Sequence, residues 1–235
     1  MMAGRVLITG VSSDIGLALC RHFLSEGFTV TGQYYTNHKN IEAFKKTIKE
    51  TDCIEFFSCD LRRPDVVSKQ FGDHIKASPP SIFIHGAAQF DSKALYAIKE
   101  SEISAILDVN LLSFFVITRR LIKPMMRKGG NIIAISSIAA TIGLPGQSVY
   151  SASKAGLIAA VQSLAKEVGN FNIRVNAIVP GQIESGGQSN SKNMPTPPLR
   201  RKGTPDDIAK LALFLTSENA AYITGAAVDI NGGLP

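Results

Sequence analysis

The sequence of 235 residues contains no tryptophan, only three cysteines and only four histidines. Cys20, Cys53 and Cys59 are an odd set without Cys-x-x-Cys spacing, which argues against a disulfide framework and against a zinc site. Reduced thiols of this kind are typical of the cytosol, so we expect a cytoplasmic protein. The histidines are scattered along the chain, and we therefore expect no metal site.

Long apolar runs are also missing, since none reaches the roughly eighteen residues that a membrane span needs. The first residues enter a strand pattern at once and show no signal-peptide pattern. Lys and Arg number 25 against 19 acidic residues, a net charge of +6. The basic residues are dispersed, which favours a phosphate-bearing cofactor and an acidic partner protein over nucleic acid.

The hydrophobic content of 45% is ample for a core, and strand patterns alternate with helix patterns. Alternation of this kind predicts an α/β fold, a doubly wound Rossmann-type parallel sheet with helices on both faces. No linker is visible, so we expect one domain over residues 1–235. Seven strands are expected at 5–9, 28–34, 53–58, 81–85, 131–136, 173–179 and 226–230. Helices are expected at 14–26, 39–51, 64–77, 99–128, 148–169 and 205–217.

The segment 184–198 is rich in Gly, Ser, Asn and Pro and lacks a helical pattern. We interpret it as a short flexible surface loop. The alternative is a mobile lid that orders when a substrate binds.

Tyr150 and Lys154 are four residues apart, which places phenol and ammonium on one face of a helix. A free phenol has a pKa of about 10, and a neighbouring ammonium lowers it toward the working range. Ser137, thirteen residues upstream, can hold a carbonyl or alkoxide oxygen while Tyr150 transfers a proton. This set predicts interconversion of a carbonyl and an alcohol.

A glycine turn links the first strand to the first helix. Gly10 allows the tight turn, Gly16 allows the helix to pack closely on the strand, and N–H groups at the helix start face a pyrophosphate. This context is typical of dinucleotide binding. The loop residues expected to contact the cofactor are Gly10, Ser12, Ser13, Asp14, Ile15 and Gly16.

With both halves present, the chain resembles the short-chain dehydrogenases/reductases over essentially its whole length. The matching segments are Thr9-Gly10-x5-Gly16, Asp60-Leu61, Asn110, Ser137, Tyr150-x-x-x-Lys154, Asn176-x-x-x-Pro180-Gly181, Tyr222-Ile223-Thr224-Gly225 and Asp229-Ile230-Asn231-Gly232-Gly233. Within that family the chain looks most similar to the 3-oxoacyl-[acyl-carrier-protein] reductases.

The resemblance implies roles for individual residues. Ser137 and Tyr150 hold the carbonyl oxygen, and Tyr150 donates the proton. Lys154 lowers the pKa of Tyr150 and binds ribose hydroxyls of the cofactor, while Asn110 opens its helix and holds a water that refills the proton. Further cofactor contacts are implied for Asp60, Leu61, Ala87, Pro180, Gly181 and Ile183.

Cofactor preference is expected to follow from the end of the second strand. NAD-specific sites place a carboxylate there, but none occurs between Glu26 and Glu42. Tyr35 and Thr36 offer hydroxyls, so we expect NADP(H) in preference to NAD(H), although the basic residue frequent in NADP sites of this family is missing.

Two residues depart from the family pattern. Asp14 stands at the middle glycine of the loop, where we interpret it as a helix N-cap that points away from phosphate. His85 opens a His-Gly-Ala-Ala sequence in place of Asn-Asn-Ala-Gly, and we interpret it as structural.

Three functions stay open. The first is reduction of a 3-oxoacyl group on acyl carrier protein. Arg127 and Lys128 lie next to the strand that precedes Ser137, and we expect them to guide the acidic carrier to the site. The second is reduction of a free pterin, sugar, steroid or quinone. The third is a catalytically idle nucleotide-binding scaffold. Long apolar helices at 99–128 and 148–169, together with the resemblance, predict a homotetramer.

Overall fold

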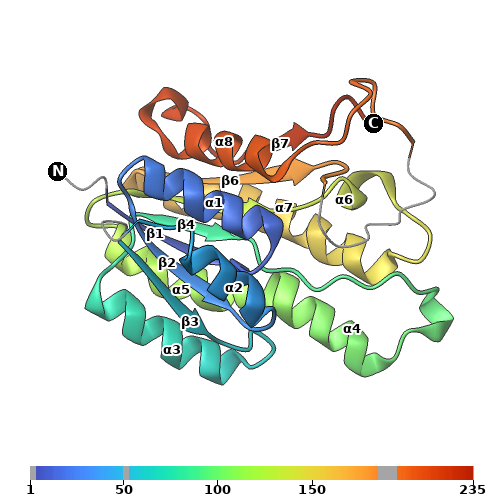
Figure 1. Cartoon of the computed structure of the whole chain (residues 1–235), viewed down its shortest axis with the longest axis horizontal. Coiled ribbons are helices and arrows are strands. Elements are labelled where there is room, and N and C mark those ends of the chain that lie inside the picture. Colours follow the sequence, from blue (N-terminus) through green and yellow to red (C-terminus); the bar gives the residue numbers. More distant parts are fainter. Residues whose placement is uncertain (1–3, 50–52, 185–194, 235) are drawn as a thin grey trace.

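The computed structural model describes residues 4–49, 53–184 and 195–234. Seven parallel strands form one sheet in the order β3-β2-β1-β4-β5-β6-β7 (Figure 1). The strand order reverses between β1 and β4, as expected of a doubly wound sheet. The strands are β1 (Arg5–Thr9), β2 (Thr29–Tyr34), β3 (Ile54–Ser58), β4 (Ile82–His85), β5 (Gly130–Ile135), β6 (Ile173–Pro180) and β7 (Ala227–Ile230).

Helices cover both faces of this sheet. One face carries α1 (Asp14–Ser25), α2 (His38–Lys45) and α8 (Pro205–Thr216), and the other carries α3 (Pro64–Ala77), α5 (Ser113–Met125) and α7 (Ser148–Val168). In Figure 1, α1 and α2 lie in front of the sheet and α5 and α7 behind it. Short elements are η1 (Leu95–Ala97), α4 (Glu100–Leu107), η2 (Asp108–Leu112), α6 (Ala139–Ile142), η3 (Gly169–Phe171) and η4 (Glu218–Ala220).

Alternation along the strands produces two separate cores. Leu7 points to the face of α3, α5 and α7, whereas Val6 and Ile8 point to the face of α1, α2 and α8. Both faces are apolar because every inner strand is covered twice, so strands such as β1 read as continuous hydrophobic runs. The predicted fold class, sheet type and strand number are confirmed.

The long apolar helix expected at 99–128 is interrupted. It divides into α4, the π-helical turn η2 and α5, because the backbone widens by one residue around Asn110. Taken together, Glu100–Met125 is long and apolar enough to cross a membrane, and an 18-residue window within it has a mean hydropathy of 1.5. Core helices pass the same test, and here Phe114 and Ile117 are fully buried against the sheet. One side of α5 therefore packs into the core of the α/β fold, and 33% of the apolar window is buried.

Two other expectations are corrected or left aside. The helix predicted over 39–51 is shorter, since α2 ends at Lys45 and a turn follows. Most of the loop or lid predicted at 184–198 lies outside the described residues.

Parallel strands bring all their carboxyl ends to one edge of the sheet. The loops after β1, β2, β3, β4, β5 and β6 therefore meet there, although they are far apart in sequence. This edge, next to the reversal of strand order, is where such sheets bind ligands.

Candidate active site

A cavity of about 720 Å³ lies along the carboxyl edge of the sheet. Fifteen of the residues predicted for the site line it. They are Gly10, Ser12, Ser13, Ile15, Tyr35, Thr36, Asp60, Leu61, Ala87, Ser137, Tyr150, Lys154, Pro180, Gly181 and Ile183. Three other predicted residues do not line the cavity: Asp14, Gly16 and Asn110. The tertiary structure thus brings six strand ends into one elongated site.

The glycine turn allows a close approach of backbone segments. Gly10 has φ +74°, and a Cβ there would lie 2.6 Å from the Cα of Ala87. A Cβ on Gly16 would lie 2.4 Å from the carbonyl oxygen of Gly10. Both positions therefore exclude any side chain, and the space left open at the start of α1 suits a pyrophosphate.

The N-cap of α1 is Ser13, which corrects the expectation for Asp14. The Ser13 hydroxyl accepts the N–H of Gly16 at 3.1 Å and donates to the carbonyl of Gly10 at 2.9 Å. Asp14 is the first helical residue, where a carboxylate interacts favourably with the helix dipole. Asp14 does not line the cavity, so its carboxylate does not face the space proposed for the pyrophosphate.

Gln33 is a site residue that the sequence did not reveal. Its side-chain carbonyl accepts the N–H of Gly10 at 3.1 Å, and its amide donates to the carbonyl of Cys59 at 2.7 Å. The buried side chain therefore ties the glycine turn to the end of β3. A glutamine inside an apolar strand was the only sequence signal for this role.

Ser137 and Tyr150 meet at the opposite end of the cavity. A hydrogen bond joins their side chains, and the Ser137 hydroxyl also accepts the N–H of Ala139 at 3.2 Å. Phe90 packs edge-on against the Tyr150 ring, with centroids 5.0 Å apart, and is 57% exposed. Phe90 was not predicted from the sequence, and it forms an apolar wall beside the phenol.

The electrostatics of Tyr150 differ from the expected mechanism. Burial raises the pKa of Tyr150, and the hydrogen bond from Ser137 opposes that rise. The Lys154 ammonium lies 5.8 Å from the ring centroid and is not among the causes of this pKa shift. With its pKa raised, Tyr150 is a protonated phenol at neutral pH, ready to donate rather than to accept a proton.

Lys154 is almost completely buried, with 1% of its surface exposed. Its ammonium donates to the carbonyl of Ile135 at 2.8 Å, while its own carbonyl accepts the hydroxyl of Ser136 at 2.9 Å. Burial without a carboxylate partner lowers the pKa of Lys154 to about 7. An ammonium has three donors, so two remain for groups bound in the cavity.

Asn110 connects the helix interruption to the catalytic helix. Its amide donates to the hydroxyl of Ser153 and to the carbonyl of Gln89, both at 3.0 Å, and its side-chain oxygen accepts the N–H of Gln89 at 2.7 Å. These bonds fix the loop after β4 against α7. Asn110 is fully buried, which places it behind Tyr150 and Lys154 in a supporting position.

His85 is buried behind the same network, and its tautomer follows from hydrogen-bond counting. The Thr9 hydroxyl accepts the N–H groups of Gly86 and Ala87, at 3.1 and 3.2 Å. Its own proton therefore goes to Nδ1 of His85, 3.1 Å away, and Nε2–H donates to the carbonyl of Asn110 at 3.3 Å. Burial, and secondarily the charge of Lys154, lowers the pKa of His85 to about 3.

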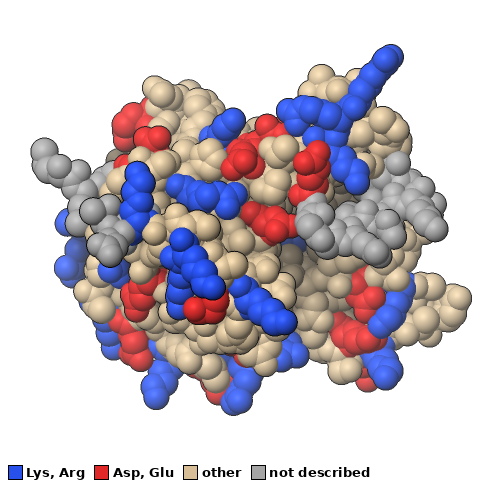
Figure 2. Space-filling view, in the orientation of Figure 1, with Lys and Arg blue, Asp and Glu red and all other residues tan. Residues whose placement is uncertain are grey.

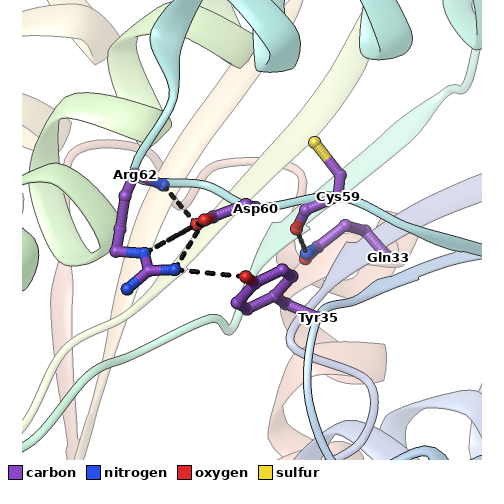
Figure 3. Close-up of polar contacts among 5 residues, drawn as sticks. All are labelled: Gln33, Tyr35, Cys59, Asp60 and Arg62. Carbon is purple, nitrogen blue, oxygen red and sulfur yellow. Dashed lines mark hydrogen bonds and ion pairs between the residues drawn. The ribbon is translucent and has the colours of Figure 1, made fainter.

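At the other end of the cavity, Tyr35, Asp60 and Arg62 form a polar cluster (Figure 3). Arg62 makes a two-pronged contact with the Asp60 carboxylate, from Nε at 2.9 Å and from Nη2 at 2.6 Å. Nη2 also donates to the Tyr35 hydroxyl at 3.2 Å. The hydrogen bond from Arg62 lowers the pKa of Asp60, so this carboxylate is ionised and paired. Sequence reasoning did not identify Arg62.

The segment after β6 closes the remaining side. A Cβ on Gly181 would lie 2.6 Å from the Cα of Asn231, so this turn packs against the loop after β7. Ile183 pairs with Gly203 in an isolated parallel bridge. Pro180 is the last residue of β6, one residue beyond the predicted strand end, and it lines the cavity.

Arg127 and Lys128 do not lie near the cavity mouth, contrary to the expectation for a carrier guide. They precede β5, whereas Ser137 follows it, so they lie at the amino edge of the sheet and line a separate groove between α3 and α5. Six strand residues at about 3.3 Å each separate the two ends. On the face in Figure 2, basic and acidic residues are interspersed.

Across the described residues, no group of three His, Cys, Asp or Glu side chains is arranged to hold a metal. A doubly wound sheet with a glycine turn and a Ser-Tyr-Lys set at its carboxyl edge defines an oxidoreductase that binds a nicotinamide dinucleotide.

Comparisons with known proteins agree with that class. Residues 10–235 match a family model described as enoyl-(acyl carrier protein) reductase. The chain is 36% identical to the 3-oxoacyl-[acyl-carrier-protein] reductase FabG of Rickettsia prowazekii, over 97% of this chain and 95% of that protein. It therefore belongs to the short-chain dehydrogenase/reductase family.

Solved structures show the same fold. A short chain dehydrogenase/reductase family protein is 28% identical, with a TM-score of 0.89 and coverage of 99% of this chain and 98% of that one. A 4-hydroxyisoleucine dehydrogenase complexed with NADH is 27% identical, with a TM-score of 0.89 and 97% of both chains covered.

Proposed function

We propose that this protein is an NADPH-dependent reductase that converts a carbonyl to an alcohol, and that its substrate is a 3-oxoacyl group carried on acyl carrier protein. The observation that carries the proposal is the meeting of Ser137, Tyr150 and Lys154 in the same cavity as the glycine turn after β1. The similarity to 3-oxoacyl-[acyl-carrier-protein] reductases supports the choice of substrate.

The residues present fit a dinucleotide. The turn at Gly10 and the segment at Gly181 are free of side chains, and neither tolerates a Cβ. N–H groups at the start of α1 would hold the pyrophosphate, and Lys154 would bind the ribose next to the nicotinamide. Asp60 and Leu61 would contact the adenine, and Ile183 with Pro180 would hold the nicotinamide ring.

When bound, the cofactor supplies the hydride that reduces the carbonyl carbon. The protein's own groups act on the oxygen. Ser137 and Tyr150 donate hydrogen bonds to the carbonyl oxygen, and Tyr150 gives up its proton as negative charge develops there. The burial that raises the pKa of Tyr150 keeps this proton in place until the substrate arrives.

Lys154 then stabilises the phenolate that remains. An uncompensated phenolate in a buried site is unfavourable, and a nearby ammonium offsets that penalty. Its pKa of about 7 lets Lys154 exchange a proton near neutral pH. The Asn110 network, which holds the loop after β4 against α7, keeps the Tyr150 helix in position while the proton is restored.

A second candidate substrate is a free planar molecule such as a pterin, steroid or quinone. The exposed ring of Phe90, edge-on to Tyr150, favours it because an aromatic wall at the mouth can stack on a flat ring. The catalytically idle scaffold is disfavoured by the complete Ser137, Tyr150 and Lys154 set.

Steady-state oxidation of NADPH with an acetoacetyl thioester and with a dihydropterin separates these candidates. We expect turnover with the thioester and a higher kcat/KM for the same group on acyl carrier protein. Turnover of the dihydropterin alone would assign the second candidate, and no turnover of any carbonyl compound would contradict the reductase assignment.

We also place the enzyme in the cytoplasm, as its reduced cysteines indicate.

A further inference from the structure

The cluster of Tyr35, Asp60 and Arg62 in the cavity points to a binding role for Arg62. This residue lies outside the glycine turn and outside β2. Its guanidinium group is planar and offers two edges for binding oxygen atoms. The edge formed by Nε and Nη2 is occupied by the Asp60 carboxylate. The other edge, formed by Nη1 and Nη2, points away from Asp60 in Figure 3.

This second edge is open to an anion. Within the described part of the chain, Nη1 has no hydrogen-bond partner, and the only group on that edge is the Tyr35 hydroxyl, 3.2 Å from Nη2. The Arg62 side chain is 44% exposed and lines the cavity. The open edge therefore faces the cavity beside Tyr35.

Tyr35 marks the position of the adenosine ribose. It follows β2 directly, at the end of the strand where the family of dinucleotide sites recognises the ribose 2′ position. An anion on the Nη1 edge of Arg62 would lie next to this position. The position of the strand end thus selects a 2′ substituent rather than the pyrophosphate, which lies at α1.

The neighbouring helix adds a second favourable feature. Asn37, the N-cap of α2, lines the cavity but makes no side-chain capping bond, and it adopts the left-handed conformation with φ 58°. The first turn of α2 contains no acidic residue and includes Lys39. An uncapped helix start of this kind favours a negative charge nearby.

The charged residues of the cavity also favour an anion at this position. The charged residues that line the cavity are Asp60, Arg62 and Lys154. An unpaired Asp60 would repel a 2′-phosphate. The contact with Arg62 neutralises the Asp60 carboxylate and leaves the Nη1 edge of Arg62 pointing away from it. We propose that Arg62 binds the 2′-phosphate of NADP(H) and is the residue that sets the cofactor preference of this enzyme.

This inference rests on the proposed preference for NADPH, and the test separates the two. Dissociation constants for NADPH and for NADH are measured by fluorescence titration of the wild-type protein. We expect NADPH to bind more tightly. Equal affinities in the wild type would contradict the preference itself and, with it, the role of Arg62.

The variant Arg62→Gln keeps a polar side chain of similar reach but removes the charge. We expect its affinity for NADPH to fall about tenfold to hundredfold, the range for loss of a charge-assisted hydrogen bond to phosphate. Its affinity for NADH should change less than about threefold. The matched control is Arg63→Gln, since Arg63 is adjacent, pairs with Asp65 at 3.5 Å and does not line the cavity.

A double variant removes the remaining ambiguity. Arg62→Gln also frees the Asp60 carboxylate, which by itself could repel NADPH. In Asp60→Asn/Arg62→Gln that repulsion is absent, so a direct contact predicts that the preference for NADPH stays lost. Recovery of the preference in the double variant, or its persistence in Arg62→Gln, would overturn the assignment of Arg62.

Discussion

Mild acid should destabilise this protein through His85. The imidazole is fully buried, its Nδ1 accepts from Thr9, and the charge of Lys154 opposes a second proton. Its pKa of about 3 in the folded chain lies below the value of about 6.5 in an unfolded chain. Between these values the unfolded chain binds more protons, so stability is complete above the unfolded pKa and falls as the pH drops below it.

The magnitude follows from these two pKa values. Lowering the pH from about 7.5 to about 5 should reduce the free energy of unfolding by roughly 2 kcal/mol through this residue. The figure is insensitive to the folded value, because a folded pKa of about 4 gives nearly the same loss at that pH. Carboxylates with lowered pKa values, such as Asp60 and Asp207, contribute mainly at lower pH.

Urea unfolding at the two pH values tests this reasoning in wild type and in His85→Gln. Glutamine does not titrate, so the variant should be less stable at neutral pH but should lose about 2 kcal/mol less than wild type on acidification. The control His38→Gln alters an exposed residue and should behave like wild type. An equal loss in wild type and His85→Gln would refute the argument.

Three further outcomes are expected. Tyr150→Phe should lower kcat at least about hundredfold and leave the dissociation constant for NADPH nearly unchanged, because only the proton donor is removed; activity within a few-fold of wild type would contradict the mechanism. Gly16→Ala should reduce the free energy of unfolding by about 1–3 kcal/mol and weaken cofactor binding, since its Cβ would lie 2.4 Å from a backbone oxygen. Gly169→Ala, where a Cβ would meet nothing within 4 Å, is the control in the same urea experiment. The protein should be a homotetramer by light scattering at micromolar concentration, because Phe115 and Leu112 leave apolar surface exposed on the long helix; a monomer would exclude this.

Local patterns determined most of the architecture. The period of apolar residues places β1 at residues 5–9 and α3 at 64–77, with the bounds that the structure shows. Such segments are predictable because burial on both faces of a parallel sheet requires continuous apolar strands. The Tyr150–Lys154 pair was equally accessible, since helical spacing alone sets two side chains on one face.

Features that depend on distant segments were not accessible in the same way. Ser13 rather than Asp14 caps α1, because the Ser13 hydroxyl reaches both Gly16 and Gly10 in the folded turn. Arg127 and Lys128 lie at the wrong edge of the sheet for the guiding role expected of them, since strand direction separates them from Ser137. Local composition does not encode either result.

The sequence by itself determined the fold class, the glycine turn and the set of Ser137, Tyr150 and Lys154. Each of these depends on residue type and on short spacing along the chain. Only the tertiary structure decided the electrostatics and the partners of Gln33, His85 and Arg62. Burial raises the pKa of Tyr150, where a lowering by Lys154 was expected, and Arg62 after β3 donates a hydrogen bond to Tyr35 after β2. A pKa and a hydrogen bond depend on which groups exclude water from one another, and that is settled only when separate strand ends meet.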